Sequence, residues 1–155
     1  MTRSPASRIR WTAGFTLLEM LVVLTILALV AAVAVPRFAA PPDGLRLEAT
    51  SRTIVGALRL TRAASVARGT ETVFVVDVEQ RTFQSPATPL QRFPSDIAAK
   101  LKIADPERLS PSAGGFRFFP DGSSTGGDLV LSLRGKERKI CVNWLTGVAR
   151  QRDDC

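Results

Sequence analysis

The pattern of hydrophobic and polar positions divides the chain into four parts. Residues 1–14 are short and polar, and residues 15–35 are almost entirely apolar. Prolines and a glycine interrupt residues 36–44, whereas residues 45–155 mix apolar and polar positions at helix and strand spacings. The pattern predicts an N-terminal peptide, an apolar helix, a flexible linker and one folded domain.

The apolar stretch, residues 15–35, has the length of a membrane-spanning helix. At about 1.5 Å per residue it makes a helix of about 32 Å, which spans the hydrocarbon core of a bilayer. It lacks the polar stripe of a helix in a soluble core. Arg3, Arg8 and Arg10 precede it without any acid, which places the N-terminus in the cytoplasm. A secretory signal that is cleaved near Val35 is the alternative interpretation.

One carboxylate, that of Glu19, interrupts the apolar stretch. An ionised side chain at mid-bilayer costs about 2.5–3.5 kcal/mol, although an acid this close to a helix end can reach the interface. If the chain is cut after Gly14, Phe15 gains an α-amine four positions before Glu19, on the same helix face. This amine and the carboxylate of Glu19, about 4 Å apart at an effective dielectric of about 20, attract each other by about 4 kcal/mol. That attraction is comparable with the cost of inserting the charge.

These N-terminal residues resemble the signal of type IV pilins and type II secretion pseudopilins. The resemblance rests on the basic leader, on GFTLLE from Gly14 to Glu19, on the apolar helix and on Pro36. It implies that a prepilin peptidase cuts after Gly14 and methylates Phe15. It also implies that Glu19 pairs with the N-terminal amine of a neighbouring subunit. Ala13 departs from the pattern, because many such leaders have Lys or Arg before the glycine.

An irregular linker and a second helix follow the apolar stretch. We expect the helix to break at Pro36 and to stay loosened through residues 36–44, because proline removes a helix hydrogen bond. Apolar residues recur at helical spacing over residues 45–68, and Gly69 is a suitable end. Most arginines of this helix are expected on a solvated face. The stripe that should pack on a sheet consists of Leu47, Ile54, Val55 and Leu58.

The remaining segments predict strands of one antiparallel sheet. The residues 85–94, SPATPLQRFP, are expected to form a proline-rich loop. Alternation places Phe116 and Phe118 on one face, and Trp144 with Ile140 on the core face. The fold class is therefore α+β, with a long N-terminal helix, half transmembrane and half amphipathic, packed on an antiparallel sheet. The predicted strands are residues 71–78, 82–84, 96–104, 115–120, 129–134, 139–144 and 148–151.

Composition argues against catalysis and metal binding. The chain has no histidine, which removes the usual general base and the commonest metal ligand, and its two cysteines are too few for a zinc site. The glycine-rich segment at residues 120–127 contains no lysine and precedes a strand, unlike a phosphate-binding loop. Asp121 and Asp128 are too few for a calcium site. We expect no enzymatic activity, no cofactor and no metal.

The two cysteines, Cys141 and Cys155, are expected to form a disulfide. Paired cysteines persist in an oxidising compartment, and alternation points Cys141 away from the core. A tight turn over residues 145–148 would bring Arg152 roughly opposite Cys141, from where Cys155 must fold back. The alternative is a frayed C-terminus in which Cys155 is free.

Two C-terminal stretches extend the resemblance to GspH/FimT-type minor pilins. These are FFPDGSSTGGDLVLS and ICVNWLTGVAR, with Asn143 and Val148 departing from the usual residues. The resemblance implies a minor pseudopilin, a structural subunit of the periplasmic pseudopilus that drives export of folded proteins across the outer membrane. Its implied partners are prepilin peptidase, the major and other minor pseudopilins, and the inner-membrane assembly platform. The implied location is the bacterial inner membrane, crossed once, with the C-terminal domain in the periplasm.

The alternative is a FimT-like minor pilin of a type IV pilus that binds DNA during uptake. Against it, the net charge falls from +7 to +4 once the three leader arginines leave, and acids interleave with the basic residues. Aromatic residues for base stacking are also sparse there. The phosphate-binding edge would consist of Arg134, Lys136, Arg138, Lys139, Arg150 and Arg152.

The leader sequence generates a first prediction. In cells that contain a prepilin peptidase, intact-mass measurement should find a mature chain that begins with N-methylated Phe15, because the basic leader and Gly14 form the cleavage signal. Cleavage near Val35, or an uncut chain, would contradict the assignment of the leader.

Overall fold

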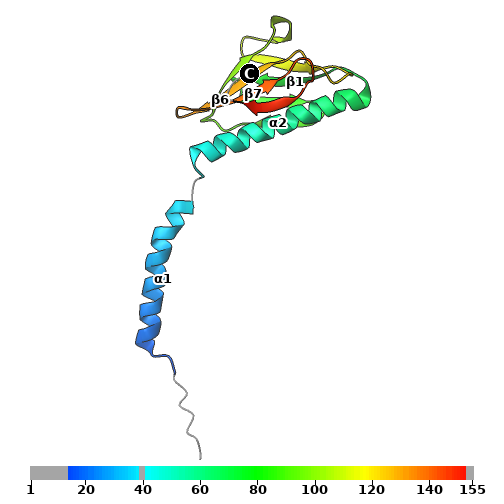
Figure 1. Ribbon diagram of the computed structural model, residues 1–155. Coiled ribbons are helices and arrows are strands. Elements are labelled where there is room, and N and C mark those ends of the chain that lie inside the picture. The colour runs from blue at the N-terminus through cyan, green and yellow to red at the C-terminus, as the bar shows by residue number, and fades with distance from the viewer. Residues whose placement is uncertain (1–13, 39–40, 153–155) are drawn as a thin grey trace, which may run out of the picture. The chain divides into compact units, whose positions relative to one another are not determined.

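The computed structural model describes residues 14–38 and 41–152. The chain separates into two units, residues 1–40 and residues 41–155. The first unit contains helix α1, Leu17–Phe38. In its described part the second unit contains helix α2, Asp43–Arg68, and eight strands (Figure 1).

Helix α1 begins directly after Thr16, whose hydroxyl oxygen accepts a hydrogen bond from the backbone N–H of Glu19 at 3.1 Å. The helix includes Pro36 and ends at Phe38, so it continues two residues past the predicted break, while the gap before α2 lies within the predicted range of residues 36–44. A proline this close to a helix end removes one hydrogen bond without ending the helix at once. Within the residues that the structure describes, no helix is long and apolar enough to cross a membrane.

Helix α2 confirms the predicted amphipathic helix and begins two residues earlier than expected. Pro42 precedes it, and Asp43 places an acid in the first turn, where the helix dipole favours negative charge. Leu47, Ile54 and Leu58 have no exposed surface. The helix ends at Arg68 and is capped by Gly69, whose φ of 62° is the left-handed conformation that glycine adopts most readily.

The strands form two antiparallel sheets instead of the single predicted sheet. The first sheet has the order β3-β2-β1-β5, and the second has the order β4-β6-β7-β8. A 3-10 helix, η1 (Asp105–Glu107), lies between β4 and β5. The strands are β1 Thr72–Asp77, β2 Thr82–Ser85, β3 Thr88–Arg92, β4 Ala98–Lys102, β5 Ala113–Phe118, β6 Gly127–Leu133, β7 Lys136–Val142 and β8 Ala149–Arg152.

The expected loop at residues 85–94 is wrong, because it contains strand β3. Pro89 lies within this strand, and β3 pairs only with β2 at the edge of its sheet. A proline is tolerated in an edge strand because its missing N–H can face away from the ladder. The pairing shifts register between Phe83 and Ser85, which accommodates the irregular strand.

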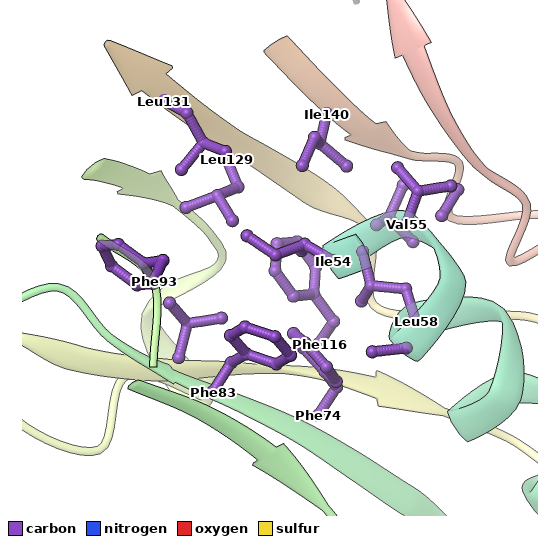
Figure 2. Close-up of a cluster of buried hydrophobic side chains, with 14 of the residues drawn as sticks. Ile54, Val55, Leu58, Phe74, Phe83, Phe93, Phe116, Leu129, Leu131 and Ile140 are labelled. Carbon is purple, nitrogen blue, oxygen red and sulfur yellow. The ribbon is translucent and has the colours of Figure 1, made fainter. Parts of the chain in front are cut away.

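The hydrophobic core lies between helix α2 and the two sheets. Figure 2 shows Ile54 and Leu58 of α2 directed toward side chains from both sheets. Burial of each large side chain contributes about 1.5–3 kcal/mol, so this cluster is the main source of stability. The first sheet contributes Phe74, Phe83 and Phe116, and the second contributes Leu129, Leu131 and Ile140.

The predicted faces of the strands are confirmed for β5 and corrected after β7. Phe116 and Phe118 are fully buried, as alternation predicts. Trp144 is 66% exposed, because β7 ends at Val142 and the chain turns at Asn143. The side-chain oxygen of Asn143 accepts hydrogen bonds from two backbone N–H groups of this turn, at 3.0 and 2.9 Å.

A matched pair of leucines on α2 tests the core. Leu58→Ala should lower the free energy of unfolding by about 2–5 kcal/mol, because it leaves a cavity among fully packed side chains. Leu60→Ala should change it by less than about 0.5 kcal/mol, since Leu60 is 58% exposed. Urea unfolding followed by circular dichroism measures both, and equal losses would contradict the described packing.

Candidate functional site

The N-terminal candidate residues lie at the start of an apolar, exposed helix. Phe15 is 79% exposed, and Glu19 is exposed in the first turn of α1. All residues from Gly14 to Ala32 are exposed, so this described segment does not bury its own apolar side chains. A continuous apolar surface of this kind is typical of a segment that contacts lipid or other protein chains.

A second candidate region is the loop clasp, which we define as residues 119–126, residues 143–148 and Arg62. The backbone N–H of Ser124 donates a hydrogen bond to the carbonyl oxygen of Trp144 at 2.8 Å. From α2, Arg62 Nε donates to the carbonyl oxygen of Gly122 at 2.9 Å. The two C-terminal motif stretches are thus held against each other and against α2.

Close approach of neighbouring atoms explains two glycines of the loop clasp. Gly147 has a φ of 60°, and a Cβ there would collide with the carbonyl oxygen of Gly122 and lie 2.9 Å from Arg62 Nε. Gly126, with a φ of 72°, would carry a Cβ only 2.9 Å from the Cβ of Trp144. The glycine-rich stretch therefore serves packing. The spacing of its residues in the sequence contained no signal for the contact with Arg62.

The acid of the loop clasp has an internal role. Asp121 Oδ1 accepts hydrogen bonds from the N–H of Ser123 at 2.9 Å and from its hydroxyl at 2.6 Å. These bonds favour the ionised form and lower the pKa of Asp121. Over residues 14–38 and 41–152, no group of three or more metal-ligating side chains could hold a metal ion.

The six predicted DNA-contacting residues do not form one surface. Lys136 and Arg138 alternate with Lys139 along β7, and successive side chains of a strand point to opposite faces. Arg138 Nε lies 3.1 Å from Glu48 of α2. Arg134 lies 3.3 Å from Asp43 at the start of the same helix.

The other three cations of that set share the outer face of the second sheet, the face opposite the core. In the β7–β8 register, Lys139 lies opposite Arg152 and Cys141 lies opposite Arg150. The prediction that Arg152 lies opposite Cys141 is therefore wrong. Arg150 lies opposite Cys141, and Arg152 follows two positions further along β8. Cys141 is not free in the structure. Cys155 lies outside the described residues, and its bond to Cys141 stays a prediction.

A groove of about 650 Å³ lies on this outer face, beside the loop clasp. Trp144 and Thr146 line it from the turn after β7, and Arg150 and Arg152 line it from β8. The sequence did not predict this groove, because strand alternation had placed Trp144 on the core face instead of beside the groove. The remaining lining residues are Thr125, Gly126, Gly127, Asp128, Cys141, Val142, Asn143 and Val148.

Comparison with known proteins finds likenesses in the N-terminal segment and in the folded domain. Residues 50–147 match the family described as type II transport protein GspH, and residues 12–35 match the prokaryotic N-terminal methylation motif. Type II secretion system protein H of Xanthomonas campestris pv. campestris is 32% identical over 141 residues. That alignment covers 91% of this chain and 83% of the relative.

Two solved structures share the fold. The minor pseudopilin EpsH of the Vibrio cholerae type 2 secretion system has a TM-score of 0.56 at 12% identity, covering 69% of this chain and 96% of its own. The type IV minor pilin FimU of Pseudomonas aeruginosa has a TM-score of 0.55 at 11% identity, covering 71% and 90%. The predicted pilin-like α+β fold is confirmed, and at these identities the likeness concerns the fold alone.

The loop clasp generates a prediction with a matched control. Gly135→Ala should lower the free energy of unfolding by about 1–2 kcal/mol, because Gly135 has a φ of 80° but open space around it. Gly147→Ala should cost about 1–3 kcal/mol more, because its new methyl group also meets Gly122 and Arg62. Urea unfolding of both variants checks this difference, and an equal loss would rule out the close approach.

Proposed function

Because the chain belongs to the family of type II transport protein GspH, we propose that it is a minor pseudopilin of the type II secretion system. In this role it is a structural subunit of the periplasmic pseudopilus, which drives export of folded proteins across the outer membrane. The likeness to a type II secretion protein H over nearly the whole chain carries the proposal.

The N-terminal motif supports a path for the protein through the inner membrane. Prepilin peptidase cleaves after Gly14 and methylates Phe15, at the position where the methylation motif matches. The apolar residues 15–35 anchor the subunit before assembly, and residues 41–155 form the periplasmic domain. This part of the proposal rests on the sequence, where the apolar stretch is about as long as a bilayer is thick.

Glu19 is the proposed assembly carboxylate. It occupies the first turn of an exposed apolar helix, where a charge without a partner is costly in an apolar environment. Pairing with the methylated amine of a neighbouring subunit offsets that cost and sets the register between helices. The major pseudopilin, other minor pseudopilins and the inner-membrane assembly platform are the proposed partners.

DNA uptake by a FimT-like minor pilin has less support. The shared fold does not separate the two functions, because it resembles both a secretion pseudopilin and a pilus protein. The charge pattern argues against DNA uptake, because Arg134 and Arg138 are paired with acids of α2. A continuous track for a phosphate backbone is therefore missing at this position of the described domain.

A substitution of Glu19 tests the proposed function. Glu19→Ala should leave membrane insertion intact, because it removes a charge from the apolar stretch. It should lower secretion of exoproteins by about tenfold or more, which corresponds to a lost attraction of about 1.4 kcal/mol or more. Secretion is measured in the bacterium of origin with the gene at its native expression level.

Glu79→Ala is the matched control, since Glu79 is an exposed acid in the turn after β1. It should leave secretion unchanged. Normal secretion by the Glu19→Ala strain would refute the assembly role of this carboxylate. If deletion of the gene abolishes DNA uptake and spares secretion, the alternative function replaces the proposed one.

A further inference from the structure

We propose that the outer face of the second sheet binds an extended, acidic segment of a partner protein. The segment would lie in the groove between Trp144 and strand β8, with its carboxylates on Arg150 and Arg152. This proposal rests on the charges and shape of the folded domain and stands independently of the secretion role.

Strand register gathers cations on this face. One row across the sheet runs Lys102, Asp128, Cys141 and Arg150, since these residues are paired in turn. The opposite face of the same strands carries Leu129, Leu131 and Ile140, which pack toward α2. The second row, two residues further along each strand, runs Lys100, Val130, Lys139 and Arg152.

The acids of the domain neutralise arginines elsewhere. Arg46 lies 2.6 Å from Asp96, and Arg117 lies 2.9 Å from Glu107. The hydrogen bond from Arg46 lowers the pKa of Asp96, which keeps that carboxylate ionised. Among residues 41–152, the acids on the outer face beside these two rows are Asp128 and Glu137, and Asp128 lies 4.0 Å from Lys139.

Arg150 and Arg152 are two neighbouring cations of the outer face that can bind a partner. Both are exposed, and over residues 14–38 and 41–152 neither has an ion pair or a side-chain hydrogen bond. Guanidinium groups bind carboxylates through two parallel hydrogen bonds, which gives both affinity and orientation. The complementary ligand for this pair is therefore anionic.

The spacing of the two arginines fits an extended chain. They lie two residues apart on β8 and point to the same face, which separates them by about 6.8 Å. Alternate side chains of an extended peptide have the same separation. Acids at every second position of a partner segment can therefore contact both arginines at once.

The walls of the groove also suit a peptide. Trp144 is 66% exposed at one side, and tryptophan and arginine are the residues that most often dominate protein interfaces. A volume of about 650 Å³ lies within the range of sites that enclose a short ligand. Single-stranded nucleic acid fits less well, because Asp128 lines the groove and binding of successive bases needs several aromatic residues.

The single tryptophan at the groove provides a direct measurement. The chain has two tryptophans, so Trp11→Phe leaves Trp144 as the only fluorophore of its kind. The full chain in nonionic detergent is titrated with peptides of about ten residues that alternate glutamate with valine, or glutamine with valine. We expect the glutamate peptide to shift the Trp144 fluorescence and to bind at least about tenfold more tightly than the glutamine peptide.

Two double variants locate the binding. Arg150→Gln with Arg152→Gln should weaken binding of the glutamate peptide by about tenfold or more. Arg68→Gln with Arg92→Gln removes the same charge from exposed positions outside the face and should leave affinity within about twofold. The circular dichroism spectrum of each variant shows whether it remains folded.

Several outcomes would overturn the proposal. Equal affinity for the glutamate and glutamine peptides would show that the face does not select acids. Equal losses in the two double variants would show only a general attraction by net charge. If oligothymidine binds more tightly than the glutamate peptide, and does so through Arg150 and Arg152, the groove is a nucleic-acid site instead.

Discussion

The burial of one helix face against both sheets is the interaction on which the domain depends. The two sheets are separate ladders, so backbone hydrogen bonds within each ladder do not hold one sheet to the other. Leu47, Ile54 and Leu58 are fully buried on α2, and this helix contacts strands of both ladders. The hydrophobic effect therefore joins the sheets through a shared helix, and loss of that packing would release both.

The same helix positions the loops of the outer surface. Arg62 binds the carbonyl oxygen of Gly122, and Arg59 binds that of Ala149 at the start of β8. Further along β8, the side chain of Gln151 donates a hydrogen bond to Ser51. Arginines that a helical pattern assigns to solvent thus serve as connectors, because their long side chains reach around the helix. Their contacts hold the turn that presents Trp144.

Local patterns predicted those elements whose determinants lie close in sequence. The helical spacing of apolar residues defined α2, and alternation defined the buried face of β5, since both periodicities follow from backbone geometry. Strand β3 was missed because Pro89 is unfavourable in most strands, and only its place at a sheet edge makes it acceptable. Trp144 was misplaced because alternation ends with the strand, and the hydrogen bonds of Asn143 end it at Val142.

The outer face of the second sheet shows why the positions of charged residues in the sequence are a weak guide to a binding surface. Arg138 and Lys139 are neighbours, yet one pairs with Glu48 of α2 and the other lies on the outer face. Which cations meet there depends on the pairing of β7 with β8, and residues in the turn between them determine that register. Because Asn143 and Gly147 form this turn, the second C-terminal motif stretch helps to decide which charges face a partner.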